Sequence, residues 1–144
     1  MPLIVRTAPH GSPDYDAAVN LRRAVLRTPL GLDFTPEQLA TEAEDTHFVA
    51  LDGDALLGAV VMTPYNATTV KLRQMAVSPA AQGRGVGAAL IRAFEDHARA
   101  QGTAAITLAA RVSAQGFYTA TGYKSEGDVF EEVTIPHIRM SKAL

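Results

Sequence analysis

The N-terminal third of the chain contains two stretches in which apolar residues recur every three or four positions, the spacing of a helix with one buried face. Ser12 and Pro13 open the first stretch as a typical N-cap and first helical residue, and the pattern predicts a helix that ends near Arg27. Thr35-Pro36 repeats this start signal, so we expect a second, short helix to about Ala43.

The middle of the chain changes to short apolar runs bounded by turn residues, which indicates β-strands. A first run covers residues 3–7, and three more cover 47–51, 55–65 and 69–77. Asp52-Gly53-Asp54 separates two of these runs, and Asp-Gly in such a place is a strong hairpin signal. The three central runs therefore predict an antiparallel meander.

The C-terminal half combines both patterns. Its expected elements are a helix over 85–101, a buried strand over 104–109, a short helix over 113–120, and a hairpin of strands 123–129 and 133–140. The complete order is β-α-α-β-β-β-α-β-α-β-β. This order predicts a mixed α/β fold in which one sheet carries helices on both faces, formed by a single domain over residues 1–144.

Composition excludes several classes of function. The chain has no cysteine, so it has no disulfide, no thiolate-bound metal and no cysteine nucleophile. Its formal net charge of -2 argues against a strongly basic nucleic-acid-binding surface. No apolar run approaches the roughly 20 residues of a membrane span, and the N-terminus lacks the layout of a signal peptide. We expect a cytoplasmic protein with no metal, no nucleic-acid partner and no membrane partner.

The most informative segment is glycine-rich: Gln82-Gly83-Arg84-Gly85-Val86-Gly87-Ala88, between the run that ends at Val77 and the following helix. The start of a helix presents free backbone N–H groups and the positive end of the helix dipole. Glycines let these N–H groups converge on an anion, because no side chain holds it away. The segment therefore suits a phosphate or a pyrophosphate.

Several interpretations of this loop compete. A P-loop is excluded because no Gly-Lys-Ser or Gly-Lys-Thr closes it. Gly83, Gly85 and Ala88 fit the dinucleotide-binding pattern formally, but the first glycine follows its strand late and the next strand ends without an acidic residue. A plain turn with tight helix packing also stays open. The remaining interpretation is the pattern Q-x-x-G-x-G, formed by Gln82, Gly85 and Gly87.

Two motifs together resemble the GNAT superfamily of N-acetyltransferases. Val77-Ser78-Pro79 with the glycine loop resembles the acyl-CoA-binding motif of that family. Downstream, residues 114–123 (AQGFYTATGY) resemble its A-x-x-F/L-Y-x-x-x-G-F/Y segment. The resemblance covers the chain from about Phe48 to Met140 and implies a small single-domain acetyltransferase, in which a central pair of parallel strands splays to hold acetyl-CoA.

The resemblance also implies where the co-substrate lies. The pantetheine arm would follow the strand that ends at Val77, with backbone groups of Met75 and Val77 along it. The pyrophosphate would meet the backbone of the loop. The residues expected to bind acetyl-CoA are Met75, Ala76, Val77, Gln82, Gly83, Arg84, Gly85, Val86, Gly87, Ala88 and Arg111. Arg111 stands where the family often has an asparagine, so it would contact either a co-substrate phosphate or an acidic substrate.

The chemistry that follows is the attack of an amine on a thioester. Without cysteine, we expect direct transfer in a ternary complex, with oxyanion stabilisation by a backbone N–H. The resemblance places Tyr118 near the thioester sulfur, and its phenol, with a reference pKa of about 10, is a proton donor at neutral pH. The general base is not determined; the candidates are His137, Glu131, Glu132 and His47, and we favour His137 and Glu131.

The acceptor side is the least defined part of the prediction. Arg73 and Gln74 are polar residues in an apolar strand, and simple alternation would place Arg73 with Met75 on one face and Gln74 with Ala76 on the other. Arg22, in the first helix, is a further candidate. The acceptor itself is a primary amine of a small molecule, a peptide or a protein, and a homodimer stays open. A catalytically inactive acetyl-CoA sensor and a dinucleotide-binding module are the alternative functions.

Overall fold

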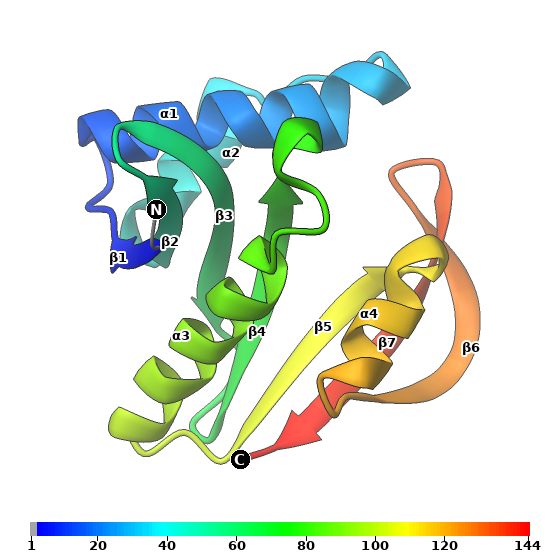
Figure 1. Cartoon of the computed structure of the whole chain (residues 1–144). Helices are drawn as coiled ribbons and strands as arrows, with labels where there is room; N and C mark the ends of the chain where they lie inside the picture. Colours follow the sequence, from blue (N-terminus) through cyan, green and yellow to red (C-terminus); the bar gives the residue numbers. More distant parts are fainter. Residues whose placement is uncertain (1–2) are drawn as a thin grey trace.

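The structure is a computed structural model, and it describes residues 3–144 (Figure 1). Met1 and Pro2, which belong to the segment examined for a signal peptide, lie outside the described residues. The longer elements are β1 (Ile4–Thr7), α1 (Pro13–Arg22), α2 (Pro36–Ala40), β2 (Thr46–Asp52), β3 (Ala55–Pro64), β4 (Thr69–Val77), α3 (Val86–Ala100), β5 (Ala105–Arg111), α4 (Gln115–Ala120), β6 (Lys124–Glu132) and β7 (Ile135–Ala143). This is the order that the sequence predicts.

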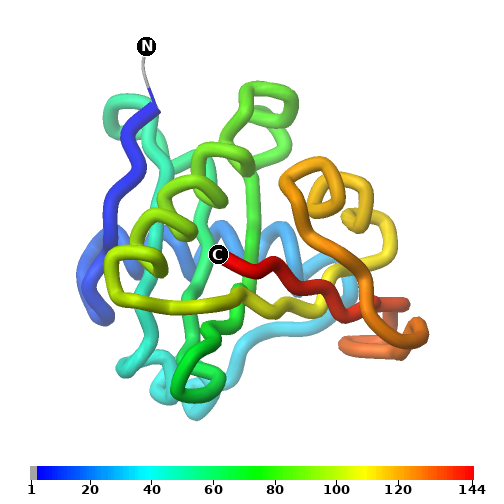
Figure 2. The backbone as a smooth tube through the Cα atoms, turned by 90° about the horizontal axis from the view of Figure 1, so that it is seen from below, coloured from blue at the N-terminus to red at the C-terminus, as the bar shows by residue number. Residues whose placement is uncertain are grey.

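One seven-stranded sheet in the order β1-β2-β3-β4-β5-β7-β6 forms the centre of the molecule. β4 and β5 pair in parallel, and every other neighbouring pair is antiparallel. Seen from below, the C-terminus lies near the middle of the molecule, where Leu144 N donates a hydrogen bond of 2.8 Å to Ala104 O (Figure 2). The prediction of a mixed α/β fold with an antiparallel meander and a central parallel pair is confirmed.

The helices cover both faces of the sheet, and strand alternation assigns each face. In β2, Phe48 and Ala50 belong to the core formed with Leu90 and Phe94 of α3, whereas the next residue along, Val49, packs with Ala18 of α1. The core on the α3 side also contains Tyr118 of α4. Residues that alternate along a strand point to opposite faces, so each strand has an α3 side and an α1 side.

The first helix ends earlier than its sequence pattern predicts. α1 stops at Arg22, and residues Arg23–Arg27 form a π-helical turn named η1. The guanidinium carbons of Arg22 and Arg27 lie 4.9 and 4.8 Å from the ring centroid of Phe34. Residues five apart point in different directions in an α-helix, and the wider π-turn brings them back to the same side.

The last hairpin is shifted toward the C-terminus relative to the expected strands 123–129 and 133–140, because its turn has no sequence signal. Val133 and Thr134 form the turn with φ values of 46° and 68°. Both residues adopt the left-handed conformation that two-residue hairpins normally give to glycine or asparagine. A β-branched pair at this place does not indicate a turn, so the strands could not be placed correctly from sequence.

A β-bulge in β4 breaks the alternation that the sequence suggests. Arg73 pairs with Val61 of β3 and Ala76 pairs with Ala59, so Val60 faces two residues of β4 instead of one. The extra residue is Gln74, whose φ of 56° lies in the left-handed region. Met75 consequently packs against the core on the α3 side. The expectation that Arg73 and Met75 share a face is therefore wrong.

A buried ion pair fixes the end of α1. Arg22 Nη1 and Nη2 donate to the two carboxylate oxygens of Glu42 at 3.0 and 2.6 Å, and Tyr15 Oη donates to the same carboxylate at 2.9 Å. His47 Nε2 donates to Glu42 O at 3.0 Å. Arg22 is fully buried and is held by this network, so the structure does not bring it to a substrate site as the sequence analysis expects.

We expect Glu42→Gln to destabilise the protein by about 3 kcal/mol at pH 7, because the Arg22 cation then stays buried without its carboxylate. Burial raises the pKa of Glu42, but its hydrogen bonds and the charge of Arg22 outweigh burial and leave the pKa below its usual value. A lowered pKa adds stability above the unfolded value of about 4.3, and this stability is lost as pH falls through the folded pKa.

Urea unfolding of both proteins between pH 7 and pH 3 tests this expectation. The difference between wild type and Glu42→Gln shrinks as the solution becomes acidic. Asp33→Asn is the control, because the Arg23–Asp33 pair is exposed and its removal changes stability little. Equal stability of Glu42→Gln and wild type at pH 7 would contradict the role of the buried pair.

Candidate active site

A cleft opens where the two parallel strands part. β4 and β5 pair only from Thr69–Ala105 to Leu72–Leu108, and beyond Leu72 the bulge directs β4 away from β5. The two strands meet at their lower ends and diverge toward their upper ends (Figure 1). The cleft between them has a volume of about 1020 Å³.

The edge of β4 that borders the cleft has backbone groups that are not paired with a neighbouring strand. Ser78 N donates to Leu57 O at 2.8 Å, so the backbone N–H of Ser78, and that of the second residue before it, Ala76, point toward β3. Alternation then turns the N–H and C=O groups of Met75 and Val77 toward the side where β5 is no longer paired. An extended ligand could bind these two residues as an added strand does.

The glycine loop lies at one end of the cleft. Gly83 and Gly85 have φ values of 80° and 76°, and a Cβ built on either one would meet no atom within 4 Å. Gly85 is the N-cap of α3, and no side chain caps the free N–H groups of the first turn. Gly87 lies against Phe117, whose ring atom would be 3.0 Å from a Cβ at this position. The loop is open to a ligand at its first two glycines and tightly packed at the third.

Two polar side chains of this loop have partners in the protein. Arg84 Nη2 donates to Asp52 Oδ2 at 2.8 Å, and its side chain is not part of the cleft wall. Gln82 Nε2 donates to Val77 O at 3.4 Å and lines the cleft. The side chain of Arg84, which was expected to bind the co-substrate, is therefore bound to Asp52 and does not line the cleft.

Tyr118 of α4 forms part of the cleft wall on the α3 side. The residue is 6% exposed, and no hydrogen bond joins its hydroxyl to another residue of the described range 3–144. Burial raises the pKa of Tyr118 far above its usual value, so the phenol remains protonated throughout the neutral range. The side chain is an O–H donor that has no acceptor within the described chain.

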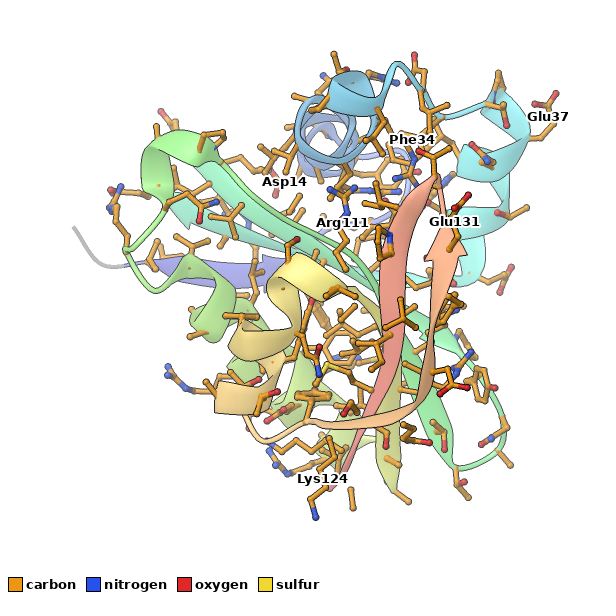
Figure 3. The ribbon with its side chains drawn as sticks, turned by 90° about the vertical axis from the view of Figure 1, so that its right-hand side faces the viewer. Asp14, Phe34, Glu37, Arg111, Lys124 and Glu131 are labelled. Atoms are coloured by element: carbon orange, nitrogen blue, oxygen red, sulfur yellow. The ribbon has the colours of Figure 1, made fainter. Side chains whose placement is uncertain are left out.

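The opposite wall of the cleft carries cations. In β5, Leu108 and Ala110 face the α3 side, so Arg111 faces the α1 side. Arg111 Nη2 donates to Leu26 O of η1 at 3.0 Å, and burial lowers its pKa. Figure 3 shows Arg111 with Phe34 above it and Glu131 on the outer strand β6. The structure therefore places Arg111 across the sheet from the glycine loop.

His137 lies beside Arg111 on this wall, because the two residues are register partners in β7 and β5. His137 Nδ1 is 2.9 Å from Ile135 O, and a carbonyl only accepts, so this nitrogen carries the proton. In the neutral ring, Nε2 then has the free lone pair, and it lies 3.6 Å from Glu132 Oε2. The pair is positioned to accept a proton from a group in the cleft.

The other candidate bases lie elsewhere. Glu131 is exposed and does not line the cleft, whereas its neighbour Glu132 does. His47 is buried in the Glu42 network, and burial is the main reason that its pKa is lowered. The structure therefore brings together Tyr118, His137 and Glu132, and it leaves Glu131 and His47 outside.

Arg27 belongs to the cleft although the sequence analysis does not select it. Its pKa is lowered, first by burial and then by the charge of Arg111. No sequence signal marks the π-turn that carries it. Gln74, which was a candidate, lines the cleft, and its side-chain oxygen is buried without a hydrogen-bond partner.

Two negative findings concern the described residues. Over residues 3–144, no group of three His, Asp or Glu side chains is close enough together to hold a metal ion. No helix in the same range combines the length and apolar character needed to cross a membrane.

Comparison with known proteins identifies the family and the fold. The model of the acetyltransferase (GNAT) domain matches residues 27–144, most of the chain. The protein therefore belongs to the GNAT acetyltransferase family, and the resemblance seen in the two motifs is confirmed. A curated relative, "Probable N-acetyltransferase 14" of Xenopus tropicalis, is 38% identical over 80 residues, which cover 53% of this chain and 39% of the relative. The match thus spans about two fifths of that relative's length.

Solved structures show the same fold over the whole chain. A protein of Lactobacillus plantarum has a TM-score of 0.85 at 23% identity, covering 99% of this chain and 98% of its own. A GNAT family acetyltransferase from Elizabethkingia anophelis, solved with acetyl-CoA bound, has a TM-score of 0.75 at 17% identity. The match covers 99% of this chain and 98% of that protein. At these identities the structures establish the shared fold.

Proposed function

We propose that this protein transfers an acetyl group from acetyl-CoA to a primary amine by direct attack in a ternary complex. The observation that carries the proposal is the cleft between β4 and β5, which joins an uncapped helix N-terminus, a protonated tyrosine and a histidine–carboxylate pair. The family supports the choice of acetyl-CoA, because a relative of this fold has been solved with that molecule bound.

The residues of the cleft fit coenzyme A. The space beside Gly83 and Gly85 allows an anion to approach the N–H groups at the start of α3, as a diphosphate requires. Met75 and Val77 would bind the amide groups of the pantetheine arm. The buried oxygen of Gln74 lacks a donor, so a polar ligand in the cleft would complete its hydrogen bonding.

Acetyl-CoA supplies the acetyl group as an activated thioester. The residues of the chain then handle the protons. His137 Nε2, with Glu132 beside it, accepts a proton from the ammonium form of the acceptor and so provides the neutral amine. The nitrogen forms a bond to the carbonyl carbon, and the carbon–sulfur bond breaks.

Tyr118 donates its proton to the leaving sulfur. The nitrogen loses its second proton as the amide forms, and this proton restores the phenol. Burial opposes a lasting tyrosinate, because the charged form is disfavoured in the cleft. Donation by Tyr118 and recovery of its proton are therefore coupled closely to bond breaking.

Release of free thiol from acetyl-CoA in the presence of a panel of primary amines tests the function, with mass spectrometry of the acetylated product. We expect thiol release that depends on both the enzyme and the amine. Binding of acetyl-CoA with no turnover of any amine would instead favour a sensor. Binding of NAD without affinity for coenzyme A would favour a dinucleotide-binding module.

Gly85→Asp should weaken coenzyme A binding at least tenfold, because it puts a carboxylate where the diphosphate is expected. Gly85→Asn is the matched control, since asparagine has nearly the same size and also tolerates the left-handed conformation. Isothermal titration calorimetry gives both dissociation constants. Equal affinities of the two variants would remove the loop from the binding site.

Tyr118→Phe should lower kcat by roughly 100-fold and leave the dissociation constant of acetyl-CoA nearly unchanged, because it removes the proton donor and keeps the ring. Steady-state kinetics and calorimetry measure the two effects. Tyr65→Phe is the control, as Tyr65 is exposed and lies outside the cleft wall. An unchanged kcat for Tyr118→Phe would show that the residue only packs.

A further inference from the structure

The acceptor half of the cleft has an excess of positive charge. The charged residues of its wall comprise four cations, Arg27, Lys71, Arg73 and Arg111, and one carboxylate, Glu132. Leu72 faces the core on the α3 side, so Lys71 and Arg73 point to the α1 side, as Arg111 does. The excess charge therefore lies across the sheet from the loop proposed for the diphosphate.

Arg27 and Arg111 bind the same neutral atom. Arg27 Nη1 donates to Leu26 O at 3.3 Å, and Arg111 Nη2 donates to the same oxygen at 3.0 Å. Two guanidinium groups that share one acceptor must lie close together. The pKa of Arg27 is lowered by burial and then by the charge of Arg111, which agrees with this closeness.

Neither of these arginines forms an ion pair with a carboxylate in the range 3–144. In the same range Arg6, Arg22, Arg23, Arg84 and Arg99 each have a carboxylate partner within 4.0 Å. Arg73 donates to Thr63 Oγ1 at 3.5 Å, and Asp45 is near enough to feel its charge. Among the three arginines that line the cleft, Arg27 and Arg111 are therefore the two with neither a carboxylate nor a hydroxyl partner in the described residues, and Glu132 is the one acidic residue whose charge acts on Arg27.

Half-buried like charges that face a cavity are stabilised when an anion enters it. A carboxylate matches the planar fork of a guanidinium and binds two such groups with charge-assisted hydrogen bonds. On the same wall, His137 and Glu132 stand ready for the amine. Arg111 and His137 are register partners in β5 and β7, so the two arrangements are neighbours on this wall, as the amine and the carboxylate of one small molecule require.

We propose that the acceptor is an amino acid or a related amine that bears a carboxylate, and that Arg27 and Arg111 bind this carboxylate. The proposal rests on the proposed acetyl transfer and names its substrate class. It also assigns Arg111 to the acceptor and not to a phosphate of the co-substrate. The two arginines set specificity, and they leave the binding of acetyl-CoA unchanged.

The test compares amino acids with their carboxamides as matched acceptors, over small, aliphatic, aromatic and charged side chains. We expect kcat/KM for the preferred amino acid to exceed that of its carboxamide at least tenfold. Arg111→Gln and Arg27→Gln should each reduce this preference, by roughly 10- to 100-fold, with little change in KM for acetyl-CoA. Arg92→Gln is the control, because Arg92 is exposed on α3 away from the cleft wall, and it should keep the preference.

Two further results separate this proposal from the proposed function. The carboxylate site is overturned, while acetyl transfer stands, if carboxamides react as well as amino acids. It is also overturned if the preference for amino acids survives in the variant that combines Arg27→Gln and Arg111→Gln. Binding of the N-acetyl amino acids and their carboxamides to the protein–coenzyme A complex is measured by calorimetry in parallel. If the N-acetyl amino acids do not bind to this complex more tightly than their carboxamides, the carboxylate site is refuted even where no amine is acetylated. Tighter binding of the N-acetyl amino acids supports the site without turnover.

Discussion

The cleft exists because β4 and β5 stop pairing after four residues, and the bulge at Gln74 is the cause. A regular β4 would continue its parallel ladder with β5 and close the sheet. The bulge has a cost, since Gln74 adopts a left-handed conformation and its side-chain oxygen is buried without a partner. β4 stays paired with β3 before and after the bulge, and β5 stays paired with β7 from Ala105 to Arg111, so these flanking pairs offset the cost.

Strand alternation also divides the chemistry between the two faces. The rule that buries Leu72, Ala110 and Ile138 under α3 and α4 turns their neighbours in the chain to the α1 side. Arg73, Arg111 and His137 are these neighbours. The tyrosine and the glycine loop therefore lie on one face and the cations on the other. Two reactants that enter from opposite faces can meet at the gap between β4 and β5.

The features that could be predicted from the sequence depend on local chemistry or on one regular spacing of hydrophobic residues along an element. Hydrophobic spacing gave α3 to within one residue at each end, and Ser12 caps α1 as expected, accepting from Tyr15 N at 3.2 Å. Features that interrupt this regular spacing, the β-bulge and the π-turn, were not predicted. A bulge is a single inserted residue, and the π-turn that carries Arg27 is set by its contact with Phe34. Both depend on tertiary partners, so Arg73 and Met75 were wrongly assigned to one face and Arg27 was overlooked.

The buried Arg22–Glu42 pair has a role that stability alone does not explain. Apolar residues of similar volume often replace a buried ion pair without loss of stability, and here Arg22 Nε has no partner. An ion pair with two hydrogen bonds, however, also fixes the orientation of both side chains. Arg22 is the last residue of α1, and it shares the ring of Phe34 with Arg27. The bidentate bond to Glu42 thus sets the start of the π-turn, and the π-turn sets where Arg27 meets Arg111. An apolar substitute would fill the space without fixing that start, so the position of the cations in the cleft depends on a carboxylate outside it.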